Sequence, residues 1–397
     1  MDGHSAAALS VVRSAGRAGH WVAVGANQGL FAAAKLSRYC RCGFDYPVST
    51  DNASHFCEAV FEFVRSQAID LLLPVTDWTL GPLSAKREMF EGICSVALPS
   101  ARALETAADK YKTIQMAEQL GIAVPRTWLI ESGCELSSAG DIQFPAVVKG
   151  RFSVRWPGEK AVFGSVAYAG SRAEVEGHVS ARLQAAGDVL LQEFVAGTGI
   201  GFSCFVADGE MFLPFQWERI REVDPRGSAS SARKSIPVDD RLAVLSGRLL
   251  SEIGFEGIAM VEYKRTTEGK MILMEINGRP WGSLALPVAC GIDYPRYLID
   301  WKLNGTVPPK SIPYKANTVC RRLVGELTYL SNLRAGKPKN WRVPYPSFWK
   351  SLAQMSLPWR PGMHYDDVWL SDPRPGIAGI ANWFAVRMKS RSGSRRT

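Results

Sequence analysis

The sequence predicts an α/β N-terminal domain, a middle region of mixed α+β structure and an irregular C-terminal extension. Helix and strand patterns alternate through the first hundred residues, which is typical of an α/β layer fold. Turn signals at Asp208-Gly209 and Glu268-Gly269 predict antiparallel hairpins in the middle region. Five of the twelve tryptophans lie among many prolines between Trp341 and Trp383. We therefore expect four segments, with bounds at 1–100, 101–310, 311–386 and a basic tail at 387–397.

In the first segment, a helix that starts at Ser5 precedes every strand pattern. A doubly wound unit ordinarily begins with a central strand, so its first strand is absent from this pattern. We therefore expect the reading frame to extend upstream of Met1 by about five or six residues, the length of one strand. The elements expected after the helix are strand Trp21–Ala26, helix Cys57–Gln67, strand Leu71–Val75 and strand Ser95–Leu98.

The middle region is predicted to combine helices with antiparallel strands. One helix is opened by Ser171 with Glu174 in the third position after it, the spacing of a capping box. Two polar stretches, 150–164 and 224–238, are expected to be loops. The other expected elements are helix Ala101–Leu120, strand Phe144–Lys149, strand Val189–Val195, helix Asp239–Ile253 and hairpin Gly257–Arg279.

The hairpin is the most informative segment, because a two-residue turn at Glu268-Gly269 would pair Glu262 with Glu275. Cross-strand β-carbons lie about 5 Å apart, so the two like charges would repel. Asn277 follows Glu275 at the strand period of two and shares its face. Two carboxylates and one amide oxygen form the oxygen-only set that suits magnesium beside a nucleotide. The opposite face is apolar and is expected to be buried: Val261, Tyr263, Ile272, Met274 and Ile276.

Three further features bear on this hypothesis, and each has an alternative explanation. The glutamates could instead be solvated or paired with cations of the same hairpin, Lys264, Arg265 or Lys270. Lys149 ends an apolar strand, where its ammonium group could meet a phosphate or simply promote solubility. The strand Leu190–Val195 could present backbone groups to an adenine edge or be a plain buried strand.

Two other groups of polar residues are weaker candidates for a site. Arg219, Arg221 and Glu222 lie on a predicted strand, and Arg233-Lys234 lie in the polar loop that follows it. Their arginines could grip carboxylate or phosphate groups, or could form ordinary surface salt bridges.

The cysteine pattern favours reduced thiols over a metal site. Eight cysteines are scattered without a C-x-x-C pair. Cys40, Cys42, His55 and Cys57 could meet around zinc, although their spacing is narrower than usual. Buried thiols on neighbouring elements are the favoured interpretation.

The order of several motifs resembles the ATP-grasp superfamily, in particular its carboxylate-amine ligases. The resemblance covers Ala101 to about Trp301, with residues 1–100 similar to the α/β domain that precedes the ATP-grasp region in that family. It fades in the C-terminal extension. The motifs are Asp109-Lys110, Lys149, Gln192-Glu193-Phe194-Val195, Glu262 and Met274–Arg279.

The resemblance implies that ATP binds between two α+β subdomains. It assigns phosphate contacts to Lys110 and Lys149, and adenine recognition to the segment Gln192, Glu193, Phe194 and Val195, through backbone groups at Glu193 and Val195. It assigns Mg²⁺, with Mn²⁺ as a substitute, to Glu262, Glu275 and Asn277. It assigns Arg279 to the transferred phosphate and the acyl phosphate. Residues 150–164 would form the lid.

The sequence departs from the family pattern in two places, one at the metal-binding motif and one in the expected lid. Gly278 stands where many relatives have proline, and the expected lid lacks the glycine run of several ATP-grasp enzymes. The implied activity is nonetheless an ATP-dependent ligase that activates a carboxylate as an acyl phosphate and couples it to an amine. A phosphotransferase of the same fold and a nucleotide-binding module without turnover are the alternatives, and Arg221 and Arg233 are further candidates for substrate contacts.

The charge distribution does not favour a nucleic-acid partner. The net charge is +9, but Arg387, Lys389, Arg391, Arg395 and Arg396 supply five of these charges, so nucleic acid is not expected. The resemblance implies small-molecule carboxylate and amine substrates. We expect a cytoplasmic location, because no secretory signal or transmembrane run occurs in the sequence.

An apolar stripe precedes the basic tail at helical spacing. We expect this stripe to dock on the ATP-binding domain, and contact of the tail with an anionic membrane is the less favoured alternative. The stripe consists of Ile377, Ile380, Ala381, Phe384 and Met388.

Overall fold

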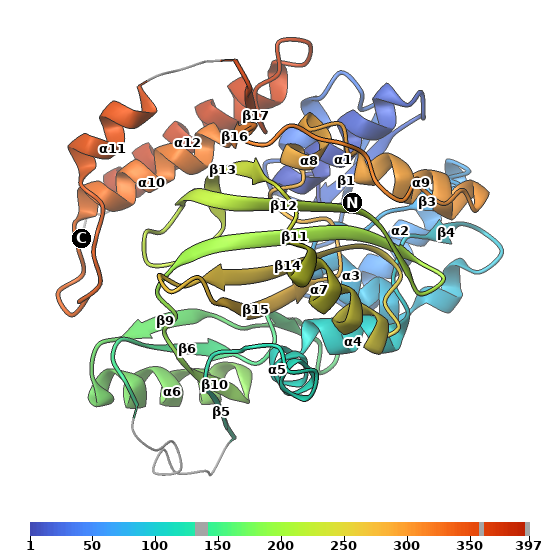
Figure 1. Ribbon diagram of the computed structural model, residues 1–397. Coiled ribbons are helices and arrows are strands. Elements are labelled where there is room, and N and C mark those ends of the chain that lie inside the picture. Colours follow the sequence, from blue (N-terminus) through green and yellow to red (C-terminus); the bar gives the residue numbers. More distant parts are fainter. Residues whose placement is uncertain (132–141, 357–360, 394–397) are drawn as a thin grey trace.

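The computed structural model describes residues 1–131, 142–356 and 361–393. A large twisted sheet crosses the centre of the molecule, with the N-terminal elements on one side and a small sheet below it (Figure 1). The C-terminal helices lie beside both sheets.

The N-terminal elements alternate as the sequence predicts, and parallel strands confirm the α/β character of this part. Ser5 caps the first helix by accepting a hydrogen bond from the Ala8 amide. The strands form two separate two-stranded sheets, β1-β2 and β3-β4. The elements are α1 (Ala6–Arg17), β1 (Ala23–Asn27), β2 (Cys42–Tyr46), α2 (Ala53–Ser66), β3 (Leu71–Leu72), α3 (Asp77–Ala85) and β4 (Ser95–Val96).

A cavity of about 470 Å³ separates these two sheets, with β1 on one wall and β3 on the other. The Met1 amino group lies at its end and donates to the Leu73 carbonyl (3.0 Å). On the other side, the Gly3 amide donates to the Gly25 carbonyl (2.9 Å). Residues 1–3 thus contact β1 on one side and the segment after β3 on the other.

The small sheet has the strand order β5-β10-β6-β9, is antiparallel throughout and is covered by α6 (Figure 1). Ser171 caps α6 by accepting from the Glu174 amide, so the predicted helix start is confirmed. Two short helices, α4 and α5, lead into this sheet. The elements are α4 (Ala101–Ala108), α5 (Lys110–Gln119), β5 (Thr127–Ile130), β6 (Ala146–Gly150), β7 (Val154–Arg155), β8 (Val162–Phe163), β9 (Val166–Ala169), α6 (Arg172–Ala186) and β10 (Val189–Glu193).

The large sheet has seven strands in the order β15-β14-β11-β12-β13-β16-β17. Its strand β13 occupies part of 224–238, so the prediction of a loop there, which included Arg233-Lys234, is wrong. Four of the seven residues of β13 are buried, and the strand pairs with β12 and β16 on its two edges, which explains how so polar a sequence forms a strand. The elements are β11 (Thr198–Ala207), β12 (Glu210–Glu222), β13 (Ser230–Ile236), α7 (Asp240–Glu252), β14 (Gly257–Arg265), β15 (Met271–Asn277), α8 (Ala285–Ala289) and α9 (Tyr294–Asn304).

The C-terminal extension is more regular than expected. In its described residues, it adds two strands, β16 and then β17, at one side of the large sheet and three helices beside them. Two buried ion pairs, Arg13–Asp372 and Arg233–Asp366, attach the extension to the rest of the protein. The local pattern of prolines and tryptophans does not predict these contacts. The elements are β16 (Val319–Arg321), α10 (Leu323–Ala335), α11 (Phe348–Met355), β17 (Met363–Tyr365) and α12 (Arg374–Gly393).

The apolar stripe on α12 does not dock on the ATP-binding region. Ile377, Phe384 and Met388 are 64%, 51% and 67% exposed, so the favoured docking interpretation is wrong for them. The helix is instead attached through another face, where Trp383 donates to the Thr328 hydroxyl (3.0 Å). Among the described residues, no helix has the length and apolarity needed to cross a membrane.

Candidate functional site

The predicted pairing of Glu262 with Glu275 is confirmed on β14 and β15. The turn is longer than predicted, because the Thr266 amide bonds to the Lys270 carbonyl, so the two-residue turn at Glu268-Gly269 is wrong. A bulge after Glu262 absorbs the extra length and shifts the register by one residue.

The bulge also changes which side chains reach the core. Val261, Tyr263 and Ile276 are buried as predicted. Leu273 takes the inward position that was expected for Ile272 and Met274, both of which are half-buried. The face that carries the glutamates is therefore retained, even though the outer half of the hairpin has a different register.

Glu262 is neutralised by an arginine that the hairpin sequence does not contain. Arg219 on β12 forms ion pairs with both Glu262 and Glu222. To reach β14, its side chain crosses β11 at Gly199, where a β-carbon would lie 2.5 Å from the Arg219 Cδ. Of the hairpin cations, Arg265 bonds to Glu218 (2.6 Å), which lies on β12.

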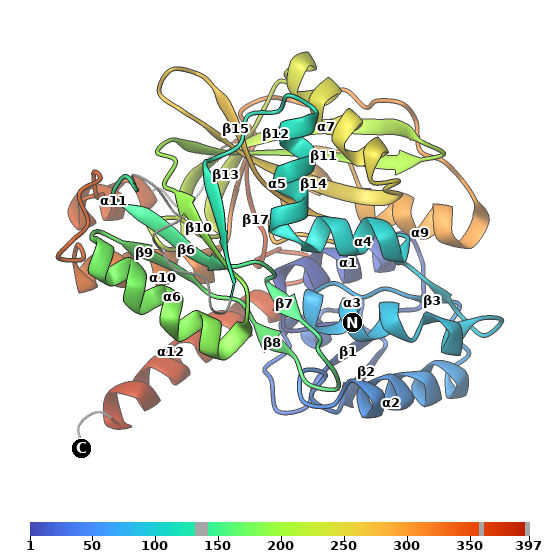
Figure 2. The same cartoon turned by 90° about the horizontal axis from the view of Figure 1, so that it is seen from below.

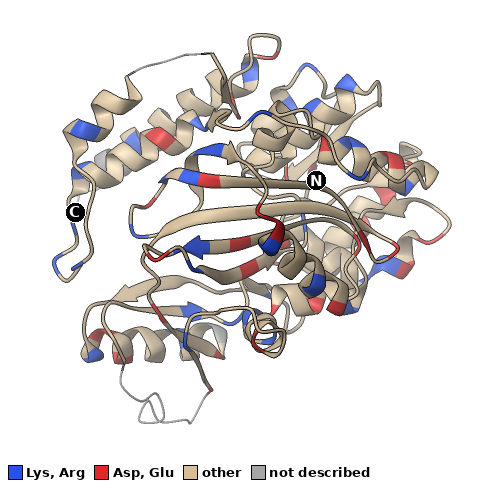
Figure 3. Cartoon of the chain, in the orientation of Figure 1, with Lys and Arg blue, Asp and Glu red and all other residues tan. Residues whose placement is uncertain are grey.

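The two paired glutamates have opposite pKa shifts. Burial raises the pKa of Glu262, and Glu275 adds to this, while Arg219 opposes it. Burial also acts to raise the pKa of Glu275, but the Lys110 and Lys149 ammonium groups outweigh it and hold the pKa below the ordinary value. Glu275 is therefore the carboxylate that stays ionised. Acidic and basic residues lie along neighbouring strands of the large sheet in this region (Figure 3).

Lys110 and Lys149 approach Glu275 from the elements around the small sheet. Lys110 starts α5 and donates to the Ser153 hydroxyl (2.7 Å). Lys149 lies on β6, and burial, followed by repulsion from Lys110, lowers its pKa to about 8. Two buried cations this close together need an anion between them, which is the arrangement expected of a phosphate site.

Asn277 and Arg279 complete this cluster at the end of β15. The Asn277 amide group donates to Glu275 (3.3 Å). Arg279 makes two hydrogen bonds of 2.8 Å to Asp77, at the start of α3. Asp77 was not predicted from the sequence, where its signal is an acidic residue in the first turn of a helix. A cavity of about 330 Å³ is lined by Asp77, Lys110, Ser153, Glu275, Asn277 and Arg279.

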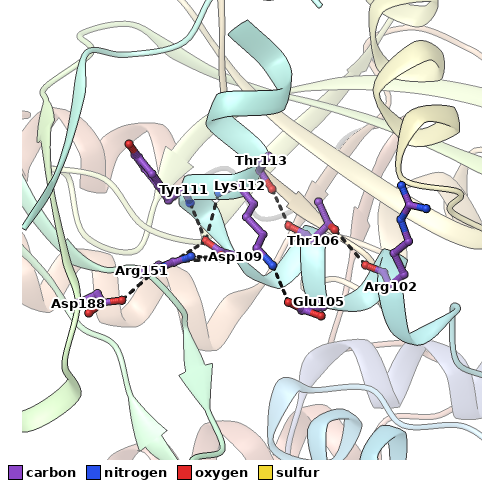
Figure 4. Close-up of polar contacts among 9 residues, drawn as sticks. All are labelled: Arg102, Glu105, Thr106, Asp109, Tyr111, Lys112, Thr113, Arg151 and Asp188. Carbon is purple, nitrogen blue, oxygen red and sulfur yellow. Dashed lines mark hydrogen bonds and ion pairs between the residues drawn. The ribbon is translucent and has the colours of Figure 1, made fainter. Parts of the chain in front are cut away.

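The predicted lid, residues 150–164, forms the small hairpin β7-β8, which reaches the N-terminal elements (Figure 2). At its tip, the Glu159 carbonyl accepts from the Ala53 amide (2.9 Å) and its carboxylate accepts from Ser54 (2.7 Å). At its base, Arg151 binds Asp109 through two nitrogens and Asp188 through a third (Figure 4). The hairpin therefore covers the cavity while anchored at both ends.

The expected adenine segment lies at the end of β10. The buried Gln192 side chain donates to Thr127 (2.8 Å), and the Glu193 amide donates to the Arg126 carbonyl (2.9 Å). The Glu193 amide is therefore occupied, and contact of its carbonyl with a base stays a prediction. Phe194 packs edge-on against Trp341 (5.1 Å between ring centroids), which brings the C-terminal extension to this segment. For Val195, adenine recognition stays a prediction.

Arg221 and Arg233 lie apart from the Glu262–Glu275 pair, in ion pairs with the C-terminal extension. Arg221 bonds to Glu326 on α10, and Arg233 bonds to Asp366 beside β17 (2.6 Å). Their suggested contacts with substrate stay a prediction, but both guanidinium groups already have carboxylate partners.

Metal ligation at the hairpin would rely on few protein groups. Within the described ranges, no three His, Cys, Asp or Glu side chains are placed to hold a metal ion, and this covers Cys40, Cys42, His55 and Cys57. Glu262, Glu275 and Asn277 do offer two carboxylates and an amide oxygen on one sheet face. That donor set fits magnesium, which usually keeps positions for phosphate and water.

The fold and this cluster define the class of protein: the chain has the ATP-grasp fold, as the resemblance implied. A family model described as "ATP-grasp in the biosynthetic pathway with Ter operon" matches residues 186–322. The biotin carboxylase domain of Hydrogenobacter thermophilus 2-oxoglutarate carboxylase, solved with MgADP, is similar with a TM-score of 0.61 and 13% identity, covering 79% of this chain and 71% of that one. An L-amino acid ligase from Bacillus licheniformis is similar with a TM-score of 0.55 and 16% identity, covering 75% and 74%.

The similarity to curated relatives extends over a smaller share of this chain. A D-alanine–D-alanine ligase of Stutzerimonas stutzeri (strain A1501) is 27% identical over 184 residues, 44% of this chain and 56% of the relative. A ribosomal protein bS6–L-glutamate ligase of Shigella boydii serotype 4 (strain Sb227) is 26% identical over 226 residues, 55% of this chain and 71% of the relative. This chain thus spans little more than half of the first relative.

Proposed function

We propose that this protein is an ATP- and magnesium-dependent ligase that activates a carboxylate as an acyl phosphate and couples it to an amine. The observation that carries the proposal is the single cavity shared by Lys110, Glu275, Asn277 and Arg279. Two curated relatives are named as ligases, which supports this activity over other reactions of the same fold.

In the first step, a substrate carboxylate oxygen attacks the γ-phosphorus of ATP, an O–P bond forms, and ADP leaves. Lys110 and Lys149 stabilise the phosphoryl charge as it shifts. Arg279, oriented by its two bonds to Asp77, holds the oxygens of the transferred group. Glu262, Glu275 and Asn277 would hold magnesium, which supplies further charge neutralisation when bound.

In the second step, the nitrogen of a neutral amine attacks the acyl carbonyl carbon. A C–N bond forms, the C–O bond to phosphate breaks, inorganic phosphate leaves, and the nitrogen releases its proton. Acyl phosphates hydrolyse in water, so the cavity has to be shielded. The hairpin β7-β8, held by Arg151 at its base and Glu159 at its tip, provides this cover.

Glu275→Gln tests the proposal, because it removes charge at nearly constant volume. We expect ADP and phosphate release, measured across a panel of carboxylates and amines, to fall by about a hundredfold or more. Magnesium should also cease to enhance the thermal stabilisation that ATP provides. The matched control is Glu268→Gln, an exposed carboxylate in the turn of the same hairpin, which should behave as wild type.

The products separate the alternatives. Phosphate release with a new amide supports the ligase, whereas a phosphorylated product without phosphate release identifies a phosphotransferase. ATP binding without turnover on any substrate pair identifies a nucleotide-binding module. Wild-type turnover by Glu275→Gln would show that the proposed magnesium site is wrong.

A further inference from the structure

The positive charge of the chain is concentrated in its C-terminal extension. Residues 311–397 contain fifteen lysines and arginines against four aspartates and glutamates, which is a net charge of +11. The whole chain has a net charge of +9, so residues 1–310, the body of the protein, have a net charge of −2. A strongly positive segment is thus attached to a slightly negative body, which favours a partner that is anionic and meets the extension.

The acids of the extension lie inside the protein and do not offset this charge at its surface. Glu326, Asp366 and Asp372 are 1%, 3% and 1% exposed, and each forms an ion pair with an arginine. Asp367 is half-buried and accepts from two backbone amides at the start of α10. The exposed charged residues in the described part of the extension are Lys315, Arg334, Lys337, Lys339, Arg342, Lys350, Arg374 and Lys389.

Helix α12 adds an exposed apolar stripe to this positive surface. Ile377, Ala381, Phe384 and Met388 follow one another at steps of four and three residues, which places them on one face of the helix. All four are exposed, and the side chains of Ile377, Phe384 and Met388 are each more than half exposed. Leu370, in the turn before the helix, is 99% exposed.

The other faces of α12 are attached to the protein. Trp383 donates to the Thr328 hydroxyl of α10 (3.0 Å). Arg387 donates to the Ser331 hydroxyl of the same helix (2.7 Å). Val386 lines a cavity of about 440 Å³ between α12 and the N-terminal residues. Figure 2 shows α12 extending to the edge of the molecule. The helix is therefore fixed on one side, while its apolar stripe faces outward.

The combination of positive charge and apolar side chains distinguishes the candidate partners. A second copy of this chain would bring an equally positive surface to the stripe, and like charges repel. Nucleic acid would neutralise the charge, but Ile377 and Met388 offer its phosphates and bases neither a charge nor an aromatic ring. An anionic lipid bilayer fits both features, because its headgroups attract lysine and arginine and its acyl chains bury apolar side chains.

We propose that the C-terminal extension docks this protein on an anionic lipid bilayer. Helix α12 lies in the plane of the interface, with its stripe toward the acyl chains and the basic residues of the extension at the headgroups. Residues 373–397 alone contain six lysines and arginines and no acid. Each such cation near an anionic bilayer strengthens binding about fivefold, and the buried stripe adds a second, apolar contribution.

Sedimentation of the full chain with lipid vesicles tests the proposal. We expect binding to phosphatidylcholine vesicles that contain about 30% phosphatidylglycerol, and at least about tenfold weaker binding to phosphatidylcholine alone, because only the former attract the extension. Binding should also weaken as the salt concentration rises from about 0.02 M to about 0.5 M, since salt screens exposed charges.

A serine variant tests the apolar stripe. Ile377→Ser, Phe384→Ser and Met388→Ser combined should weaken vesicle binding by at least about tenfold, because the stripe can no longer be buried among acyl chains. The melting temperature should not change, since these side chains are exposed. The matched control combines Ile93→Ser and Val244→Ser, which are 47% and 61% exposed on the body, and it should bind vesicles as wild type.

A glutamine variant tests the charge. Arg391→Gln, Arg395→Gln and Arg396→Gln combined should weaken vesicle binding by at least about tenfold. The matched control lowers the net charge of the chain by the same amount on the body, and it should bind as wild type. It removes three exposed arginines on different helices: Arg65→Gln, Arg172→Gln and Arg296→Gln.

The inference is overturned if the full chain does not bind anionic vesicles at low salt, or if either the serine or the glutamine variant binds them as wild type. It is also overturned if light scattering shows a dimer that the serine variant dissociates without losing vesicle binding, because the stripe would then be an interface between copies. Binding of single-stranded RNA that both variants weaken, with vesicle binding unchanged, would assign the surface to nucleic acid instead. The proposed ligase function is tested separately, by turnover in the absence of lipid.

Discussion

At the scale of single residues, the site depends on two carboxylates with different surroundings. The Lys110 and Lys149 ammonium groups lower the pKa of Glu275. Glu262 forms an ion pair with Arg219, and burial raises its pKa. Environments that separate the pKa values of paired acids are typical of functional sites. Glu275 is consequently the stronger metal anchor of the two, and Arg219 keeps Glu262 in place when no cation is bound.

Lys149 provides a prediction with a defined pH dependence. Its pKa is lowered to about 8 by burial and by Lys110, and only the protonated form attracts phosphate. The ATP affinity that depends on this charge is therefore present below pH 8 and lost as the pH rises through that value. Lys149→Met should weaken ATP by about tenfold or more, leave adenosine unaffected and abolish this pH dependence between pH 7 and 9.

Calorimetry with ATP and adenosine at pH 7 and pH 9 measures both effects. Lys112→Met is the control, because Lys112 is 43% exposed and pairs with Glu105 rather than lining the cavity. Equal losses for ATP and adenosine in Lys149→Met would contradict a phosphate role for this lysine.

At the scale of elements, the hairpin shows what a sequence pattern can predict. The pairing of Glu262 with Glu275 was predictable, because apolar and polar residues alternate along both strands and this local pattern determines the register. The bulge and the longer turn could not be predicted from the sequence, because Glu-Gly is a weak signal for any particular turn type. The ion pair of Arg219 with Glu262 and that of Arg279 with Asp77 were not predicted, because Arg219 reaches β14 across β11 and Asp77 lies 202 residues from Arg279. Local sequence patterns do not predict such contacts.

The segment between α10 and α11 gives a prediction about the adenine end of the site. Trp341 is 6% exposed and packs edge-on against Tyr168 and Phe194, with centroids 5.4 Å and 5.1 Å away. Trp341→Ala should destabilise the fold by about 3–5 kcal/mol, as for other buried tryptophans, and weaken adenosine binding because Phe194 loses its support.

Thermal unfolding and adenosine calorimetry measure this. The control is Trp349→Ala in the same extension, where the side chain is 75% exposed and should be dispensable. If Trp341→Ala melts like the control, the extension does not stabilise the small sheet.

At the scale of the whole molecule, buried ion pairs join the ends of the chain. Arg13 on α1 bonds to Asp372, 359 positions away, and both side chains are 1% exposed. Arg233 and Asp366 are equally buried and link β13 to the extension. The alternating N-terminal pattern and the central hairpins were predictable from local periodicity. The attachment of the extension was not, since it depends on single charged residues far apart in the sequence.

The cavity between β1 and β3 supports a final prediction about the N-terminal sheet. Residues of β1 and β3 line two of its walls. Neighbouring strands in a sheet lie about 4.7–4.9 Å apart, so an added strand would have to pair with these walls at that spacing. The Met1 amino group lies at the end of this cavity, and burial lowers its pKa, which shows that a charged terminus is unfavourable there. An extended apolar segment joined to Met1 would replace that charge with a peptide bond and fill the space.

Six residues of alternating valine and isoleucine added before Met1 should therefore raise the melting temperature by several degrees. A strand buried on both faces favours a continuous apolar run, and each buried side chain of this size contributes about 1.5–3 kcal/mol. The control carries six glycine and serine residues, which extend the chain equally but bury little apolar surface. Melting of both extended proteins at the wild-type temperature would show that β1 and β3 do not accept a strand between them. Hydrogen exchange then gives an independent measure, since the added strand should slow exchange of amides on the facing edges of β1 and β3 and leave those of the small sheet unchanged.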